Sequence, residues 1–207
     1  MDNADLIAKL ETKKAGFKLI QTEAEIALKG LSAGESFLLA TEMYHSDIYQ
    51  ARMFATFIFG HFAASNQAAY NFLLERVVYD PDWRTQEMLA RAFDQFCKDK
   101  GYQDSLSIIE AWLVSPEPNQ RRAASEGLRI WTSRPYFKDH PEAAISLLAS
   151  LRTDPSVYVR KSAGNALRDI SKRYPDLIKS ELDTWDLTDS AIAFTYKLSA
   201  KFITGEP

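Results

Sequence analysis

The sequence predicts an all-helical protein, and two patterns point to this class before any motif is considered. Apolar residues recur at three- and four-residue spacing, as in Met88, Leu89, Ala92, Phe93 and Phe96, which is the spacing of one buried helix face. The alternation typical of strands is nearly absent, and seven of the eight prolines lie between the periodic stretches. We therefore expect about ten or eleven helices and no sheet.

Three of the prolines mark helix starts. Proline loses no hydrogen bond in the first helical turn, and a neighbouring Asp, Asn or Ser can cap free backbone amides. The tripeptides with these features are 80–82 (Asp-Pro-Asp), 154–156 (Asp-Pro-Ser) and 174–176 (Tyr-Pro-Asp). We expect a helix to begin at each of them.

Four short segments align without gaps and indicate an internal repeat: 51–56, 86–91, 121–126 and 160–165. A small residue follows three positions after the second position of each segment. The period, about 35 to 39 residues, is that of a helical hairpin of the HEAT type, in which small residues let neighbouring helices approach closely. The prediction is a HEAT-like helical-repeat solenoid, an α-α superhelix with a concave polar face. A bundle is the alternative, because any all-helical bundle has units of hairpin length.

We expect one domain over residues 1–207, because this length suits a single array of small units and 46% hydrophobic content can bury a core. The repeats are best defined over 47–175, with capping helices at both ends. The single Cys97 cannot form an intramolecular disulfide, and no apolar run approaches the length of a membrane span. These features predict a reduced, soluble, cytoplasmic protein. We also expect a monomer.

One face of the repeated helices is polar throughout. The aligned position and the residues four and seven positions on are Glu87, Arg91, Asp94, Arg122, Glu126, Arg129, Lys161, Asn165 and Arg168. In a solenoid these side chains would form a continuous inner wall. The same pattern is also typical of the solvated side of any amphipathic helix.

Charge is segregated along the chain. The net charge is −3, from 25 Lys and Arg against 28 Asp and Glu, but residues 119–173 hold eleven basic and five acidic residues, a balance of +6. The remainder has 14 basic and 23 acidic residues and carries −9. Clustered cations attract backbone phosphates whatever the net charge, so this stretch predicts a polyanion-binding surface. The candidate DNA-binding residues are Arg122, Arg129, Arg134, Lys138, Arg160, Lys161 and Arg168.

Trp83 and Glu87 lie four residues apart at the start of a predicted helix and therefore share a face. Arg122 occupies the position equivalent to Glu87 one repeat later and is expected beside it. An indole attracts a cation and a carboxylate stabilises developing positive charge, so this group would suit a cationic ligand or transition state. The structural alternatives are a Trp83 that anchors packing and a salt bridge between Glu87 and Arg122.

Over most of its length, and best between Asp82 and Pro175, the chain resembles the HEAT-like alkylpurine DNA glycosylase superfamily, the AlkC and AlkD families, and more closely its AlkC-like members. The matching segments are DWRTQE (82–87), NQRRAASEGLRIWTSRPYF (119–137) and DPSVYVRKSAGNALRDISKRYPDL (154–177). The resemblance implies an all-helical DNA-binding surface and hydrolysis of the N-glycosidic bond of N3- or N7-alkylated purines. It implies that Trp83 and Glu87 are the aromatic residue and the catalytic acid, with Arg122 as their neighbour and Glu126 as a second acid.

The chemistry agrees with this implication, because an alkylated purine is cationic and already a good leaving group. Its departure creates an oxocarbenium-like sugar, which a nearby carboxylate can stabilise while it positions water. We therefore predict a DNA repair glycosylase that acts on alkylated double-stranded DNA in the bacterial cytoplasm or nucleoid, with no metal and no cofactor.

Two departures from the family pattern keep other functions open. Glu87 replaces the Asp of the AlkD pattern, and Lys161 or Asn165 stands where a tryptophan is expected. A DNA-binding paralogue without catalysis is therefore one alternative. A HEAT-repeat scaffold for a protein partner is the other.

Overall fold

The computed structural model describes residues 3–11 and 16–203, and every regular element within these ranges is helical, which confirms the all-helical prediction. The described ranges contain thirteen α-helices, more than expected, because helices as short as the five residues of Pro135–Asp139 leave no periodic pattern in a sequence. The chain divides into two compact units, Met1–Lys100 (unit 1) and Gly101–Pro207 (unit 2). The single continuous domain over 1–207 stays a prediction.

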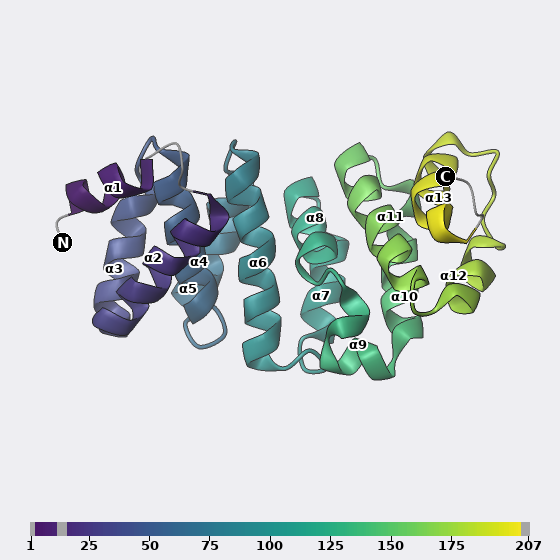
Figure 1. Ribbon diagram of the computed structural model, residues 1–207, viewed down its shortest axis with the longest axis horizontal. Helices are drawn as coiled ribbons and strands as arrows, with labels where there is room; N and C mark the ends of the chain where they lie inside the picture. Colours follow the sequence, from purple (N-terminus) through teal and green to yellow (C-terminus); the bar gives the residue numbers. More distant parts are fainter. Residues whose placement is uncertain (1–2, 12–15, 204–207) are drawn as a thin grey trace. The chain divides into compact units, whose positions relative to one another are not determined.

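Unit 1 is built around α4, which packs against the helices that precede and follow it (Figure 1). Phe59 of α4 stacks on Phe72 with ring centroids 4.2 Å apart and meets Phe37 edge-on at 5.5 Å. The elements are α1 (Asn3–Glu11), α2 (Phe17–Gly30), α3 (Ala33–Tyr44), α4 (Tyr49–Phe62), α5 (Gln67–Glu75), a 3₁₀ turn (Val77–Tyr79) and α6 (Trp83–Lys100).

Unit 2 has two layers of helices. The helices α8, α11 and α13 are neighbours in one layer, and α7 and α10 lie behind α8 and α11 in Figure 1. The α-helices are α7 (Leu106–Leu113), α8 (Pro118–Gly127), α9 (Pro135–Asp139), α10 (Pro141–Ala149), α11 (Val157–Ser171), α12 (Pro175–Leu182) and α13 (Ser190–Ser199). Short 3₁₀ turns lie at Trp131–Ser133, Ser150–Thr153 and Ala200–Phe202.

Glycine permits the closest helix approach in each unit. A Cβ atom placed on Gly60 of α4 would lie 2.5 Å from the Cβ of Ala92 in α6, and one on Gly164 of α11 would lie 2.8 Å from the Cβ of Leu198 in α13. Real carbon atoms do not approach so closely, so these helix pairs pack only because the side chain is missing. The small residue expected at position 164 therefore serves close packing, as predicted.

A side chain near the start of each repeated helix reaches back to the loop before it. Arg52 Nη1 donates to the carbonyls of Ser46 (3.0 Å) and Asp47 (2.9 Å). Arg121 Nη1 donates to the carbonyls of Ser115 (2.7 Å) and Pro116 (3.0 Å). Equivalent contacts join Arg160 Nη1 to the carbonyls of Asp154 and Pro155, and Gln86 Nε2 donates to the carbonyl of Asp80.

These bonds correct the register of the first repeat. They make Arg52, Gln86, Arg121 and Arg160 equivalent, whereas the sequence alignment placed Ala51 in this column. The equivalent segment is thus 52–57. The loop carbonyls fix the position, and sequence similarity over so short a segment is too weak to detect a shift of one position.

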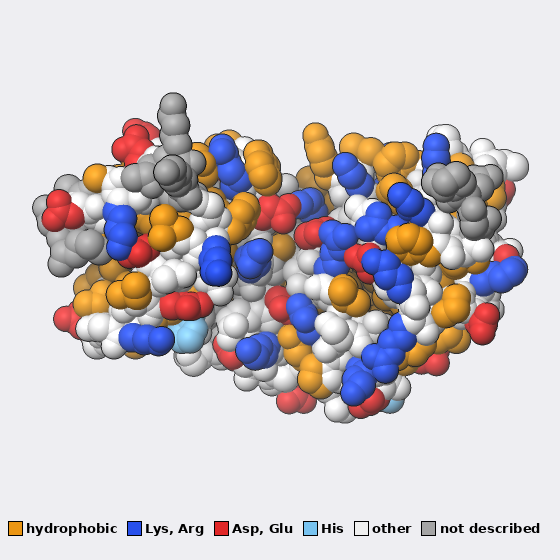
Figure 2. Space-filling view, in the orientation of Figure 1, with side chains coloured by type: hydrophobic (Ala, Val, Ile, Leu, Met, Phe, Trp, Pro, Cys, Tyr) orange, Lys and Arg blue, Asp and Glu red, His pale blue; other side chains and the backbone are white. Residues whose placement is uncertain are grey.

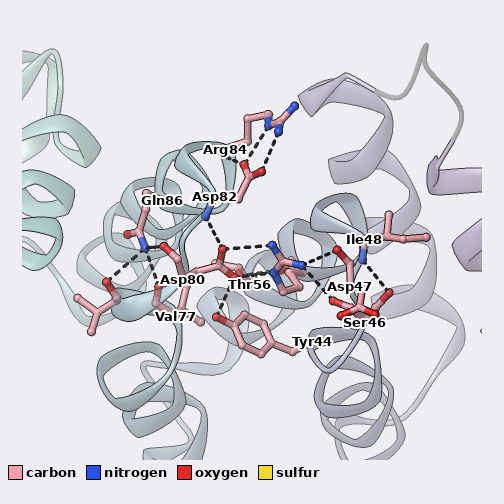
Figure 3. Close-up of polar contacts among 12 residues, drawn as sticks. Tyr44, Ser46, Asp47, Ile48, Thr56, Val77, Asp80, Asp82, Arg84 and Gln86 are labelled. Carbon is pink, nitrogen blue, oxygen red and sulfur yellow. Dashed lines mark hydrogen bonds and ion pairs between the residues drawn. The ribbon is translucent and has the colours of Figure 1, made fainter.

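Two of these arginines also form buried ion pairs with the aspartate that precedes the next repeat. Arg121 Nε lies 2.6 Å from Asp154 Oδ2, and its Nη2 lies 2.9 Å from Oδ1, with only 10% and 4% of the two side chains exposed. Arg52 and Asp80 repeat the pair in unit 1, with Nε 2.7 Å from Oδ2. Figure 3 shows Asp80 at the centre of this network, where it also accepts a hydrogen bond from Tyr44.

The predicted helix starts are confirmed, and the aspartates have a larger role than capping. The helices α6, α11 and α12 begin at Trp83, Val157 and Pro175. The carboxylates of Asp80 and Asp154 accept the backbone N–H two residues on, at 2.9 and 2.8 Å, while holding their arginines. Each carboxylate therefore positions a helix start and fastens it to the repeat before.

Breaking one buried pair tests how much of the fold depends on it. We expect Arg121→Met to lower the free energy of unfolding by about 3 kcal/mol, because it leaves the Asp154 carboxylate buried and unpaired. The double variant Arg121→Met/Asp154→Leu should recover part of this loss, since no charge is then buried alone. Urea unfolding followed by circular dichroism measures both. A loss below about 1 kcal/mol for the single variant contradicts the role given to the pair.

Candidate nucleic-acid interface

The candidate DNA-binding residues lie on or beside three helices of unit 2. Arg122 belongs to α8 and Arg129 follows its C-terminal end, while Arg134 precedes α9 and Lys138 belongs to it. The remaining three, Arg160, Lys161 and Arg168, lie on α11, which packs directly on α8. Figure 2 shows Lys and Arg side chains gathered over these helices. Lys138 and Lys161 are exposed, and the arginines are half-buried.

Arg129 and Glu126 form a compact network with α11. Arg129 Nη1 lies 2.9 Å from Glu126 Oε1, and its Nε lies 2.8 Å from Asp169 Oδ2. The other oxygen of Glu126, Oε2, accepts a hydrogen bond from the Ser162 hydroxyl at 2.8 Å, and that hydroxyl accepts one from Ser125 at 2.9 Å. Both oxygens of the Glu126 carboxylate are thus occupied within unit 2. Arg129 is held between two carboxylates, so it fastens α8 to α11.

Asp169 is the acid on which this network converges. Arg168 Nη2 lies 3.5 Å and Lys172 Nζ 3.4 Å from its Oδ1. Burial by itself would raise the pKa of Asp169, but the hydrogen bond and charge of Arg129, together with Arg168, hold that pKa below its ordinary value. Asp169 was not among the residues predicted from the sequence. Its position directly after Arg168 was the available signal, but its partner Arg129 is 40 residues away along the chain.

The aromatic residues between α8 and α9 serve packing. Trp131 and Phe137 are fully buried with ring centroids 4.9 Å apart, and Trp131 Nε1 donates to the carbonyl of Ser125 at 3.1 Å. Arg134 reaches the Ser133 hydroxyl at 3.2 Å and the carbonyl of Arg129 at 3.4 Å. Of this segment, the exposed Lys138 is the side chain best placed to meet an external anion.

In unit 1, Trp83 and Glu87 share one face of α6, as the spacing predicted. Trp83 is 63% exposed, so the interpretation of this residue as a packing anchor is wrong. Glu87 is half-buried one turn further on. Arg122 belongs to unit 2, and the expected pairing of Glu87 with Arg122 stays a prediction.

The structure adds three residues beside Trp83 that the sequence analysis missed. The guanidinium of Arg84 lies over the ring of Tyr49, 3.5 Å from its centroid, and 5.5 Å from the Trp83 ring. Its Nη2 lies 2.7 Å from Asp82 Oδ2. Asp82 and Arg84 could have been found from the sequence, because they flank Trp83. Tyr49 could not, because it comes from another helix.

Within the described ranges, no group of three or more His, Cys, Asp or Glu side chains is arranged to hold a metal ion. None of the helices described there is long and apolar enough to cross a membrane.

The repeated helix pairs, joined by arginines that reach back to the preceding loop, define a helical-repeat protein of the HEAT-like class with a cationic helix face. Residues 19–197 match the family described as DNA alkylation repair enzyme. The chain therefore belongs to this family.

Three known proteins are similar to this chain. The crystal structure of AlkD2 from Streptococcus mutans is 47% identical with a TM-score of 0.92, and the match covers 98% of this chain and 99% of that one. The Pseudomonas fluorescens alkylpurine DNA glycosylase AlkC, bound to DNA containing an abasic site analog, is 22% identical with a TM-score of 0.60, over 98% of this chain and 61% of that chain. At this identity the likeness is one of fold.

The third is an uncharacterized protein, YhaZ of Bacillus subtilis (strain 168), 36% identical over 107 residues, which are 50% of this chain and 29% of that protein. The match thus spans less than a third of that curated relative. This chain shares more identity with AlkD2 than with AlkC.

Acid should weaken the Asp169 network. Because the folded-state pKa of Asp169 is lowered, its contribution to stability is present above the unfolded-state pKa of about 3.9 and is lost as the pH falls through the folded-state value. We expect Asp169→Asn to lower the free energy of unfolding by about 1–2 kcal/mol at pH 7, and by progressively less as the pH falls below about 3.9. Urea unfolding at a series of pH values from 7 downward measures this. Asp139→Asn, an exposed carboxylate of the same unit, is the control and should show no such difference.

Proposed function

We propose that this protein binds the sugar–phosphate backbone of double-stranded DNA through the cations of α8, α9 and α11. The observation that carries the proposal is the concentration of positive charge on adjacent helices of unit 2, within a stretch whose balance is +6. Phosphates are bound by such clusters without reference to base sequence. AlkC, which has a similar fold and whose structure is bound to DNA, supports the same ligand.

The cations differ in what they can contribute. Lys138 and Lys161 are exposed and bear their charge toward solvent. Arg129 and Arg168 lie at equivalent positions of successive repeats, both against Asp169, so part of their charge is neutralised within the protein. We therefore assign the main phosphate contacts to the two exposed lysines. The positive potential of the cluster is increased by its arginines, which are Arg122, Arg129, Arg134, Arg160 and Arg168.

Excision of cationic N3- or N7-alkylated purines is the second function we propose, by a monomer in the bacterial cytoplasm or nucleoid. It is favoured by the exposed Trp83 and by Glu87 on the same face of α6. The base leaves with the electron pair of the N-glycosidic bond and becomes neutral, while water adds to the sugar and loses a proton. A carboxylate stabilises the positive sugar and receives this proton.

Glu87 suits the role of this acid better than Glu126, because it lies one turn from the exposed Trp83. An indole and a carboxylate on one helix face can act on the same cationic group. Glu126 instead accepts hydrogen bonds from Arg129 and Ser162 within the contact between α8 and α11. In this assignment Glu126 is a positioning residue that acts through Arg129, and Trp83 contacts the sugar or the cationic base.

Charge reversal tests the binding surface. Lys138→Glu/Lys161→Glu should weaken binding to a fluorescein-labelled duplex by about tenfold or more at low salt, and should flatten the dependence of affinity on salt. Fluorescence anisotropy over a range of salt concentrations measures both. Lys197→Glu, a single reversal on α13, is the control for a change of charge outside the cluster. Unchanged affinity in the double variant contradicts the proposal. The alternative function, a scaffold for a protein partner, is then favoured.

Base release tests the second function. Wild type should release 7-methylguanine from alkylated duplex DNA, and Glu87→Gln should slow release by about 100-fold, because the charge that stabilises the sugar cation is lost. Glu126→Gln should slow base release less, and only in proportion to its loss of DNA affinity. Chromatography of the released base measures the rates. If wild type binds DNA and releases no base, excision is wrong and the protein is a DNA-binding member of its family.

A further inference from the structure

An exposed aromatic side chain lies on the cationic surface of unit 2. Tyr158, in the first turn of α11, is 71% exposed, and Val157 beside it is 44% exposed. The aromatic residues Trp131 and Phe137 of the same unit are fully buried and serve packing, whereas Tyr158 buries too little surface to do so. In Figure 2, hydrophobic side chains stand directly beside Lys and Arg side chains over α11.

The position of Tyr158 along α11 places it among the cations assigned to DNA. Lys161 and Asn165 follow three and seven residues later, which puts them on the same side of the helix. Arg160 belongs to the same turn, and its guanidinium carbon lies 5.5 Å from the ring centroid of Phe194 on α13. A nucleotide whose base meets the ring of Tyr158 would therefore find cations for its phosphates within about one helical turn.

The helices α8 and α11 run in the same direction. Ser125 in α8 meets Ser162 in α11, with the hydroxyl oxygens 2.9 Å apart. Arg129, four residues after Ser125, meets Asp169, seven residues after Ser162. Residues further along the one helix thus meet residues further along the other.

This direction brings a third cation to the level of Tyr158. Arg122 precedes the α8 serine of this contact by about one turn, and Tyr158 precedes the α11 serine by about one turn. The two residues therefore stand at the same level of adjacent helices. Tyr158 has Arg160 and Lys161 near it on its own helix and Arg122 on the neighbouring one.

Acidic residues do not interrupt this part of the surface. Asp154, the acid before α11, is buried in its pair with Arg121, and Asp189 accepts hydrogen bonds from two backbone amides of α13. From 155 to 168 the sequence holds no acidic residue and three basic ones, Arg160, Lys161 and Arg168. An aromatic side chain set among cations is the pattern by which proteins hold single-stranded nucleic acid, because bases stack on the ring while phosphates meet the cations.

We infer that Tyr158 stacks on an unpaired base, so that this surface prefers DNA with unpaired nucleotides to an intact duplex. Inside an intact duplex both faces of each base are covered by its neighbours, and the ring of Tyr158 has no face to contact. Where the duplex is interrupted, a base face is available, and stacking adds to the phosphate contacts. The inference rests on the proposed phosphate binding by α8 and α11. It adds a base contact that requires neither alkylation nor Glu87.

Two fluorescein-labelled duplexes of equal length test the inference, one intact and one with a short single-stranded gap near its centre. By fluorescence anisotropy, wild type should bind the gapped duplex about fivefold or more tightly than the intact one, the strength of one base stacked on an aromatic ring. Tyr158→Ala should bind both duplexes with the affinity of wild type for the intact one. Tyr158→Trp should keep the preference, because any aromatic ring can stack on a base.

A 2-aminopurine placed in the gap reports the base contact directly, since its fluorescence depends on stacking. The signal should change when wild type binds and should not change when Tyr158→Ala binds at saturating concentration. Thermal melting of Tyr158→Ala is expected within a few degrees of wild type, because the side chain is exposed.

The matched control is Tyr79→Ala, which removes a tyrosine that is 59% exposed in unit 1. This variant should keep the wild-type preference for the gapped duplex. Lys161→Glu should weaken binding to both duplexes by a similar factor, because both present phosphates.

Equal affinity of wild type for the two duplexes overturns the inference and leaves the proposed phosphate binding intact. An equal loss for both duplexes in Tyr158→Ala also overturns it, because Tyr158 then supports the surface without contacting a base. A protein that binds neither duplex contradicts the inference and the proposed function together. A protein partner for this aromatic and cationic surface is then favoured.

Discussion

A buried arginine–aspartate pair is the interaction on which both units depend. Arg52 with Asp80, and Arg121 with Asp154, join the start of one repeated helix to the start of the next. Each pair is saturated: the arginine also binds two loop carbonyls, and the aspartate binds a backbone amide. A buried ion pair is tolerated when each of its polar groups has a hydrogen-bond partner. Because these partners are the loop carbonyls and amides at the helix starts, the pair fixes where each repeat begins.

Ion pairs between arginine and a carboxylate also occur nearer the surface, in the candidate sites. Arg129 is shared between Glu126 and Asp169, and Arg84 is held by Asp82 and two rings. In both places an anion of the protein restrains a cation at the edge of a helix. The charge available to DNA is therefore smaller than the count of arginines indicates, and the exposed lysines gain importance.

This arrangement separates two tasks within one helix. On α11, Ser162 and Asp169 face the network that ties it to α8, whereas Lys161 is exposed. Neighbouring residues on a helix point in different directions, so a structural contact and a ligand contact can alternate along it without competing. The pattern explains how a cationic surface can be built over a well-packed layer.

The sequence by itself determined the helical class, the helix starts at Asp80-Pro81-Asp82 and Asp154-Pro155-Ser156, and the existence of a hairpin-length repeat. It also placed Trp83 and Glu87 on one face, because helical periodicity is a local property that a few neighbouring residues already encode.

Only the tertiary structure decided which charges meet. It moved the first repeat by one position, paired Glu126 with Arg129 and Ser162, exposed Trp83 and brought Tyr49 to Arg84. Many of these partners come from different helices and are far apart in the sequence. Their contacts depend on how the helices pack, and a helical pattern specifies which face is buried without specifying the side chain that will lie against it.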